Sequence, residues 1–167
     1  MAIVTQVSVE EYLHTVYRPD CDYVDGELEE RNLGQTDHSR LQKRLTIYLG
    51  TREQQYGIVV FPEQRVQLSV SRFRVPDLCV LVGSEPTEAI LTTPPLVCIE
   101  ILSPDDRMSR VNQRIEDYLV FGVRYVWVID PATKAAYAYT QKGMHQVTGL
   151  LRTENPTIEV PLAALFD

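Results

Sequence analysis

The chain has 167 residues, of which 44% are hydrophobic and 23% are charged, and this composition is typical of one globular domain. Its formal net charge of −7 argues against non-specific nucleic-acid binding, which depends on basic side chains that neutralise phosphates. No apolar stretch reaches the length of a membrane span, and residues 1–6 lack the pattern of a signal peptide, so we expect a cytoplasmic protein that does not bind a membrane.

The first thirty residues predict a short helix and an extended turn. Ser8 precedes a helical segment over residues 9–13 and can cap it with its hydroxyl. Residues 23–28 are expected to be extended around a tight turn at Asp25-Gly26, because this dipeptide favours such turns.

A longer helix is predicted next. Thr36 or Asp37 can cap its start, and Gly57 is expected to end it. One stripe at helical spacing follows its length and consists of His38, Leu41, Leu45, Tyr48 and Leu49.

Four extended segments come after this helix. Residues 58–61 form a short apolar run, and residues 64–70 alternate polar and apolar side chains, as a half-exposed antiparallel strand does. Two longer apolar runs over residues 78–82 and 96–102 are typical of buried strands, and a loop over residues 83–95 separates them.

The C-terminal half predicts a helix, a buried strand and a hairpin. Gly122 is expected to end the helix, whose apolar stripe is Met108, Val111, Ile115, Tyr118 and Leu119. A strand over residues 124–130 follows, and the segments 135–140 and 144–148 read as a closing hairpin. The fold class is therefore α/β with a mixed sheet. Its core order is helix, three strands, helix, strand, and the last two strands are parallel through a right-handed crossover.

Two acidic residues occupy positions at which an unpaired carboxylate would be energetically unfavourable. Asp77 opens one buried run, and Glu100 interrupts the other. A carboxylate in a buried strand is costly unless a charge pairs with it. If the two strands are neighbours, the carboxylates converge, and hard oxygen ligands of this kind suit Mg²⁺ or Mn²⁺. The alternative left open is a pair of structural acids that meet arginines.

Other residues in these runs are expected to be structural. Cys79 and Cys98 lie within the apolar runs and are interpreted as small core residues, and the third cysteine gives no zinc-like spacing. Trp127 is assigned to the core for the same reason.

Several segments together resemble the Uma2 family, a group of restriction-endonuclease-like bacterial proteins within the PD-(D/E)xK nuclease superfamily. The matching segments are Val75-Pro76-Asp77 and residues 97–106, 118–123 and 126–131, with residues 23–28 and His38 similar to the family's N-terminal signature. The resemblance covers nearly the whole chain. It implies one nuclease-like domain over residues 1–167, with a mixed sheet flanked by helices, an added N-terminal helix and strand, and an added C-terminal hairpin. It also implies that Asp77 and Glu100 are metal ligands with the Ile101 carbonyl nearby.

The sequence departs from the superfamily pattern at one catalytic position. Leu102 stands where the superfamily has a lysine, two residues beyond the acid. The family often has a lysine four residues before the tyrosine that matches Tyr118, and Arg114 occupies that position here. Arginine can hold a phosphate or stabilise developing charge, but it is a poor general base. We therefore name Arg114 a catalytic candidate; its alternative role is to pair with Asp117.

Other polar residues are weaker candidates. Glu27 could reach the metal site or be an exposed acid, and His38 could line the site or be a hydrogen-bonded core histidine. Gln64 could also reach the site, whereas Asp105 and Asp106 are expected to cap the helix that follows them.

Three functional hypotheses follow. The first is a Mg²⁺-dependent endonuclease that hydrolyses DNA, with catalytic residues Asp77, Glu100 and Arg114. The second is a nuclease-fold protein with weak or no cleavage that binds nucleic acid or a protein partner, which Leu102 and the negative charge favour. The third is a structural module whose buried acids pair with arginines. A homodimer is expected as well, formed through an exposed strand near either end of the chain.

Overall fold

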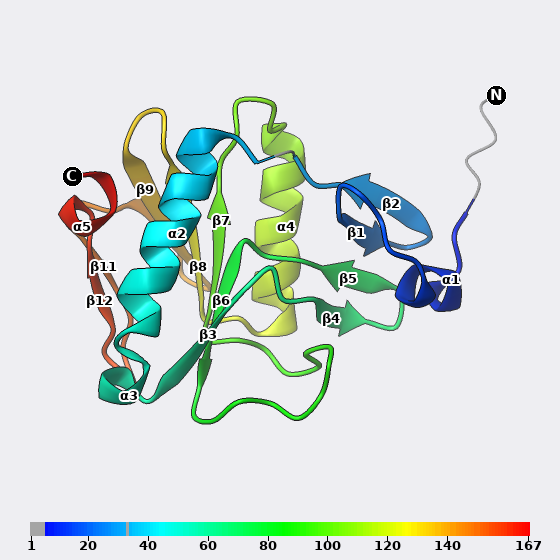
Figure 1. Cartoon of the computed structure of the whole chain (residues 1–167), viewed down its shortest axis with the longest axis horizontal. Coiled ribbons are helices and arrows are strands. Elements are labelled where there is room, and N and C mark those ends of the chain that lie inside the picture. Colours follow the sequence, from blue (N-terminus) through cyan, green and yellow to red (C-terminus); the bar gives the residue numbers. More distant parts are fainter. Residues whose placement is uncertain (1–5, 33) are drawn as a thin grey trace.

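The computed structural model describes residues 6–32 and 34–167, and a six-stranded mixed sheet lies at its centre (Figure 1). Residues 1–5, which entered the signal-peptide expectation, lie outside the described residues. In spatial order the strands are β10 (Gly143–Gln146), β9 (Ala135–Thr140), β8 (Tyr125–Asp130), β7 (Val97–Ile101), β6 (Leu78–Val82) and β3 (Ile58–Pro62). The β7–β8 pair is parallel, as predicted, and the other pairs are antiparallel.

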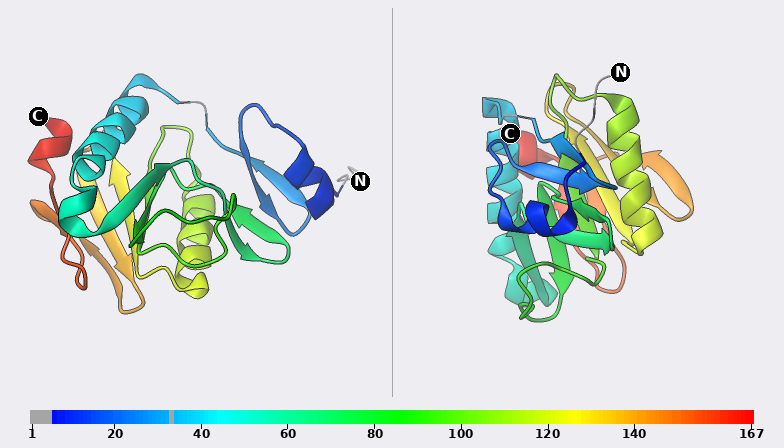
Figure 2. Two further views of the ribbon diagram at one scale, coloured as in Figure 1. Left: turned by 60° about the horizontal axis from the view of Figure 1, so that its bottom comes forward. Right: turned by 90° about the vertical axis from the view of Figure 1, so that its right-hand side faces the viewer.

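Two helices cover the two faces of this sheet. The right-hand view of Figure 2 shows α2 (Thr36–Gly50) and α4 (Met108–Phe121) on opposite sides of the strands. Side chains alternate between the faces, so the central strands contribute to both cores. Leu78, Val80, Val97 and Ile99 pack with the α2 stripe, whereas Cys79 and Cys98 pack with α4. Burial on both faces explains why these strands are continuously apolar.

A second, four-stranded sheet lies beside the first and was not predicted as a unit. Its order is β2 (Glu27–Glu30), β1 (Cys21–Val24), β5 (Arg72–Arg74) and β4 (Val66–Ser69). Together with α1 (Val9–His14) it forms the right-hand part of Figure 1. The rings of Tyr12, Tyr23 and Phe73 pack together and join α1 to β1 and β5. We call β1, β2, β4 and β5 the small sheet.

The predicted core order is confirmed, since α2, β3, β6, β7, α4 and β8 follow one another around the central sheet. The expectation for residues 64–70 was wrong in part. Only Val66–Ser69 form a strand, and it pairs with β5 in the small sheet rather than with β3 or β6. A register shift between Gln67 and Ser69 breaks the alternation, and Val70 is 85% exposed in the turn that follows.

The bounds of α2 correct two capping predictions. Gln35, rather than Thr36 or Asp37, precedes the first turn of α2, and its side chain makes no capping bond. The helix ends at Gly50, and Gly57 instead ends a separate short helix, α3 (Glu53–Tyr56), with φ at +65°.

The start of α4 is also different from the prediction. Arg107 is its cap residue, while Asp106 accepts a hydrogen bond from the Ser103 amide (2.7 Å) and closes the preceding loop. Gly122 ends α4 in the left-handed region at φ +112°, as predicted. Asp105 and Asp106 do not cap α4 because both lie in the loop before Arg107, the cap residue of the helix.

The C-terminal segment adds elements that the sequence did not predict. These are β11 (Leu150–Arg152), β12 (Glu159–Pro161) and α5 (Ala163–Phe166). Arg44 of α2 donates to the Leu165 carbonyl (2.8 Å) and holds α5 against that helix. Within residues 6–32 and 34–167, no helix combines the length and the apolar character needed to cross a bilayer.

Candidate active site

Glu100 lies on β7, and Asp77 immediately precedes β6, the adjacent antiparallel strand. Leu78 pairs with Ile99 at the end of the β6–β7 ladder, so Asp77 and Glu100 stand one position beyond it, across from each other. Both residues are buried, with 3% and 2% of their surfaces exposed. The neighbouring strands expected from the sequence are therefore present, and they bring the two acids to one end of the ladder.

Three groups hold the Asp77 carboxylate. Arg31 donates from Nη2 to Oδ1, and His38 Nε2 lies 3.3 Å from the same oxygen. The backbone amide of Ile101 donates to Oδ2 at 2.7 Å. A carboxylate that enters a buried strand end is thus compensated by one permanent cation, one imidazole and one amide.

Glu100 is held by residues of α4. Arg114 donates from Nη1 to Oε2 at 3.1 Å, and the Tyr118 hydroxyl donates to Oε1 at 2.7 Å. Positions 114 and 118 are four residues apart on a helix, so both side chains point at the same strand residue. Arg114 therefore pairs with Glu100 rather than with Asp117, the alternative partner considered from the sequence.

The environments of the two acids shift their pKa values in opposite directions. Burial alone would raise the pKa of Asp77, but the hydrogen bond from His38 and the charge of Arg31 outweigh it and lower that pKa. Burial raises the pKa of Glu100, Arg114 opposes this, and the charge of Asp77 adds to it. The hydrogen bond to Asp77 raises the pKa of His38 against the effect of burial. Paired carboxylates with divergent pKa values are typical of reactive sites.

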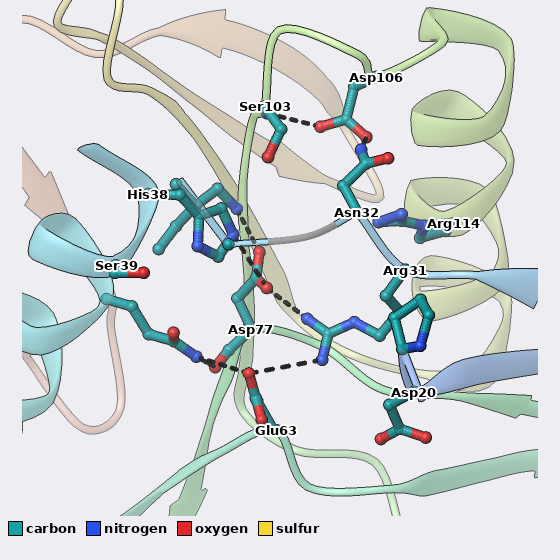
Figure 3. Close-up of a pocket in the computed structure, with 14 residues that line it drawn as sticks. Asp20, Arg31, Asn32, His38, Ser39, Glu63, Asp77, Ser103, Asp106 and Arg114 are labelled. Carbon is teal, nitrogen blue, oxygen red and sulfur yellow. Dashed lines mark hydrogen bonds and ion pairs between the residues drawn. The ribbon is translucent and has the colours of Figure 1, made fainter. Parts of the chain in front are cut away.

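A cavity of about 240 Å³ opens beside Asp77 (Figure 3). It is lined by fourteen residues, among which the charged side chains are four acids and two arginines, with His38 beside them. The acids are Asp20, Glu63, Asp77 and Asp106, and the arginines are Arg31 and Arg114. Asp77, Arg114 and His38 were all named from the sequence as site candidates, and the structure brings them to one cavity.

Arg31, Gln42 and Glu63 belong to the site although the sequence did not point to them. The Gln42 side chain donates to the Asp77 carbonyl at 3.1 Å, one helical turn after His38. Polar residues four apart beside an apolar stripe were the available signal for Gln42. Glu63 has a φ of +51°, a value that non-glycine residues adopt infrequently, and no sequence pattern predicts this conformation. Arg31 follows a strand in a loop and carries no local signal.

Two of the weaker candidates lie elsewhere. Glu27 is exposed at the start of β2, and Gln64 donates to the carbonyls of Arg65 and Ala89. Neither is among the residues that line the cavity.

A second buried charge cluster supports the site from the small sheet. Arg74 is fully buried, and its guanidinium donates to Asp117 of α4 and to Asp22 and Glu29. Asp22 also lies 3.8 Å from Arg114 Nε. The small sheet is therefore joined to α4, and through Arg114 to Glu100, by charged contacts.

The chemistry of the donors fits a divalent cation. Asp77 and Glu100 offer carboxylate oxygens, which Mg²⁺ and Mn²⁺ prefer. Two guanidinium groups and an imidazole already contact these oxygens, so an ion would have to replace some of these contacts. Among the described residues, no three His, Cys, Asp or Glu side chains are grouped as ligands of one ion. An ion here would use the two acids, backbone oxygen and water, and Arg31 would have to leave Asp77.

A mixed sheet between two helices, with two acids at the end of adjacent strands, defines the restriction-endonuclease-like class of nuclease folds. The chain belongs to the Uma2 family, whose model, described as "Putative restriction endonuclease", matches residues 9–165. Among solved structures, it is similar to a protein from Anabaena variabilis described as a "putative nuclease belonging to DUF820". The two are 23% identical, the TM-score is 0.85, and the match covers 96% of this chain and 97% of the other. At that identity the likeness establishes the fold. No curated protein matches the chain.

Proposed function

We propose that the protein is a divalent-cation-dependent endonuclease that hydrolyses phosphodiester bonds of DNA. The observation that carries this proposal is that Asp77 and Glu100 face each other across adjacent strands, with Asp77 and the Glu100 partner Arg114 lining a polar cavity. Membership of a family described as restriction endonucleases supports DNA as the substrate. The divalent cation is supported separately, because nucleases of this fold generally use such metals.

Asp77 and Glu100 would hold Mg²⁺ or Mn²⁺. Such an ion lowers the pKa of a bound water and stabilises charge on the phosphate. Burial keeps the carboxylates in a region of low dielectric, which strengthens their hold on a cation. The Ile101 amide fixes the orientation of the Asp77 carboxylate, and the Tyr118 hydroxyl does the same for Glu100.

Arg114 would bind an oxygen of the scissile phosphate. Its guanidinium lines the cavity, and only one of its nitrogens donates to Glu100 within the described part of the chain. The charge of Glu100 raises the pKa of Arg114, so this side chain stays protonated and cannot act as a base. Because Leu102 stands in place of the usual lysine, that position offers no general base for the attacking water.

The test is nicking of supercoiled DNA in Mg²⁺ or Mn²⁺ by the wild type and by Glu100→Gln. The glutamine keeps the shape of the side chain and removes its charge, so we expect nicking to fall by at least about 100-fold. Glu116→Gln is the matched control, since Glu116 lies exposed on α4. Equal nicking by wild type and Glu100→Gln would assign the activity to a contaminant and refute the proposal.

A second candidate is a nuclease-fold protein that binds nucleic acid or a protein partner without cleaving. The arginine partners of both acids favour it, because Arg31 and Arg114 satisfy the carboxylates that would otherwise call for an ion. DNA binding by gel shift, together with intact DNA after long incubation in Mn²⁺, would support this candidate over the endonuclease.

A homodimer is part of the proposal as well. The strand β10 is exposed along its whole length and lies at one edge of the central sheet. Pairing of two such edges would join the central sheets of two protomers into one continuous sheet. Light scattering that shows only monomer at high protein concentration would exclude it.

A further inference from the structure

Arg31 lines the cavity, and neither the family resemblance nor the proposed function assigns it a role. Its side chain is 12% exposed, its Nη2 donates to Asp77, and its Nη1 lies 3.8 Å from Glu63 Oε1. Figure 3 shows the guanidinium between these two acids. A permanent positive charge therefore lies in the cavity, directly on one of the two proposed metal ligands.

The backbone around Arg31 is held from two sides. The Arg31 amide donates to the Asp20 carbonyl at 2.9 Å, and the Asn32 side chain donates to Asp106 at 2.6 Å. The side chain beyond this anchored backbone has a flexible stem that ends in a fork of five donors. The guanidinium can thus exchange one anionic partner for another within the cavity while the backbone stays in place.

Charge in the cavity makes such an exchange necessary. A divalent ion on Asp77 competes with Arg31 for the same oxygen, and like charges this close repel each other. Four acids line the cavity against two arginines, so a phosphodiester, which is itself negative, needs cations in order to approach. Arg31 is therefore expected to oppose metal binding in the free protein and to favour phosphate binding in the loaded one.

We infer that Arg31 exchanges between two anions: Asp77 in the ion-free protein, and a backbone phosphate of DNA once a divalent ion holds Asp77. The inference rests on the proposed function and adds a substrate-positioning residue to it. It also couples the two ligands. DNA that takes up Arg31 removes a competitor from Asp77, so DNA and the ion each strengthen the binding of the other.

The experiment compares Arg31→Gln with the wild type in two binding assays that do not depend on cleavage. By calorimetry we expect Mn²⁺ to bind Arg31→Gln at least about fivefold more tightly, because a competing charge is gone. For a short DNA duplex in Ca²⁺ we expect binding to weaken by at least about fivefold. The slope of log affinity against log salt should fall by about one, as for a lost phosphate contact.

The matched control is Arg152→Gln. Arg152 pairs with Glu154 and Glu159 at β11, so this variant also removes an arginine from an ion pair with acids, but outside the cavity. Both affinities should stay at the wild-type level in the control. Arg31→Lys, which keeps the charge, should retain most of the DNA affinity and its salt slope.

In Arg31→Gln the affinity for the ion should rise and the affinity for DNA should fall, and these opposite changes distinguish the proposed role from a structural one. A structural residue would weaken both affinities or leave the salt slope unchanged, and either result in Arg31→Gln overturns the inference. Should Arg31→Gln fail to fold, side-chain NMR of wild-type arginines decides. The Arg31 signal, assigned with Arg31→Lys, should shift on Mg²⁺ addition and again on DNA addition, and a signal that moves in neither step overturns it.

Failure of the proposed function would look different. A wild-type protein that binds no Mn²⁺, or whose Mn²⁺ binding survives in Asp77→Ala, removes the metal site and with it this inference. A wild type that binds Mn²⁺ through Asp77, combined with unchanged affinities in Arg31→Gln, leaves the metal site intact and removes the exchange alone.

Discussion

Replacement of Arg74 by methionine should destabilise the protein more than any exposed charge replacement. Arg74 is fully buried, and it makes four hydrogen bonds to three acids: two to Asp117 (2.9 and 2.7 Å), one to Asp22 (3.1 Å) and one to Glu29 (2.6 Å). Burial already raises the pKa of Asp22, and the charges of Arg114 and Arg74 oppose this rise. Without Arg74, buried acids remain with too little positive charge.

Removal of one partner from a buried ion pair costs about 3–5 kcal/mol of unfolding free energy. A domain of this size has about 5–15 kcal/mol in total, and its Tm falls by about 2–4 °C per kcal/mol. We therefore expect Arg74→Met to lower the Tm by about 6–20 °C. The exposed pair partner Arg152 provides the control, since Arg152→Met should leave the Tm close to the wild-type value.

Urea denaturation followed by fluorescence measures the difference directly. Trp127 is the single tryptophan and is fully buried, so its emission reports loss of the core. A cycle with Asp117→Asn then isolates the coupling between Arg74 and Asp117. A loss below about 1 kcal/mol in Arg74→Met, with no measurable coupling, would refute the argument that these charges depend on one another.

Three smaller predictions concern protonation and backbone geometry. Burial raises the pKa of the Cys79 thiol to about 12, so in the folded protein iodoacetamide should modify it only as fast as the chain unfolds. This raised pKa contributes stability that is fully present below the ordinary thiol pKa of 9.0 and is lost as the pH rises toward 12. Urea titrations at pH 8 and pH 10 should therefore show a smaller alkaline loss of stability in Cys79→Ala than in the wild type, by about 1 kcal/mol. NMR of metal-free protein in EDTA should give His38 a pKa above 6.5 that falls in Asp77→Asn, and an unchanged pKa would contradict the pair. Gly122→Ala should cost more stability than Gly57→Ala in thermal melts: both have positive φ, but only at Gly122 would a Cβ meet a neighbouring side chain, at 3.2 Å.

Long apolar runs made the central sheet predictable. Residues 78–81 and 96–101 are buried, with side chains on both faces of the sheet, so the burial appears in the sequence as consecutive apolar residues. Gly122 predicted the end of α4 because glycine, which has no Cβ, readily adopts the left-handed backbone conformation found at helix ends. The small sheet escaped prediction because its strands are three or four residues long, and the charged β5 reads as a turn.

The site was predictable only where an acid interrupted an apolar pattern. Asp77 and Glu100 were named as candidates in this way, and Arg114 through the resemblance. Arg31 lies 46 positions before Asp77, and nothing local distinguishes it from a solvent-exposed arginine. Pairing over such a separation is set by how two sheets meet, and a single sequence does not encode that in any short pattern.

The charged contacts that join the small sheet to α4 alternate in sign along a continuous path. Asp25 holds Arg72, Arg72 and Arg74 share Asp117, and Arg74 reaches Asp22 beside Arg114. A chimera that takes the small sheet from one relative and α4 from another would place mismatched charges along this path. The small sheet and α4 must therefore be exchanged between relatives together. In an alignment of the family, covariation between positions 74 and 117 should be stronger than covariation within the small sheet or within α4.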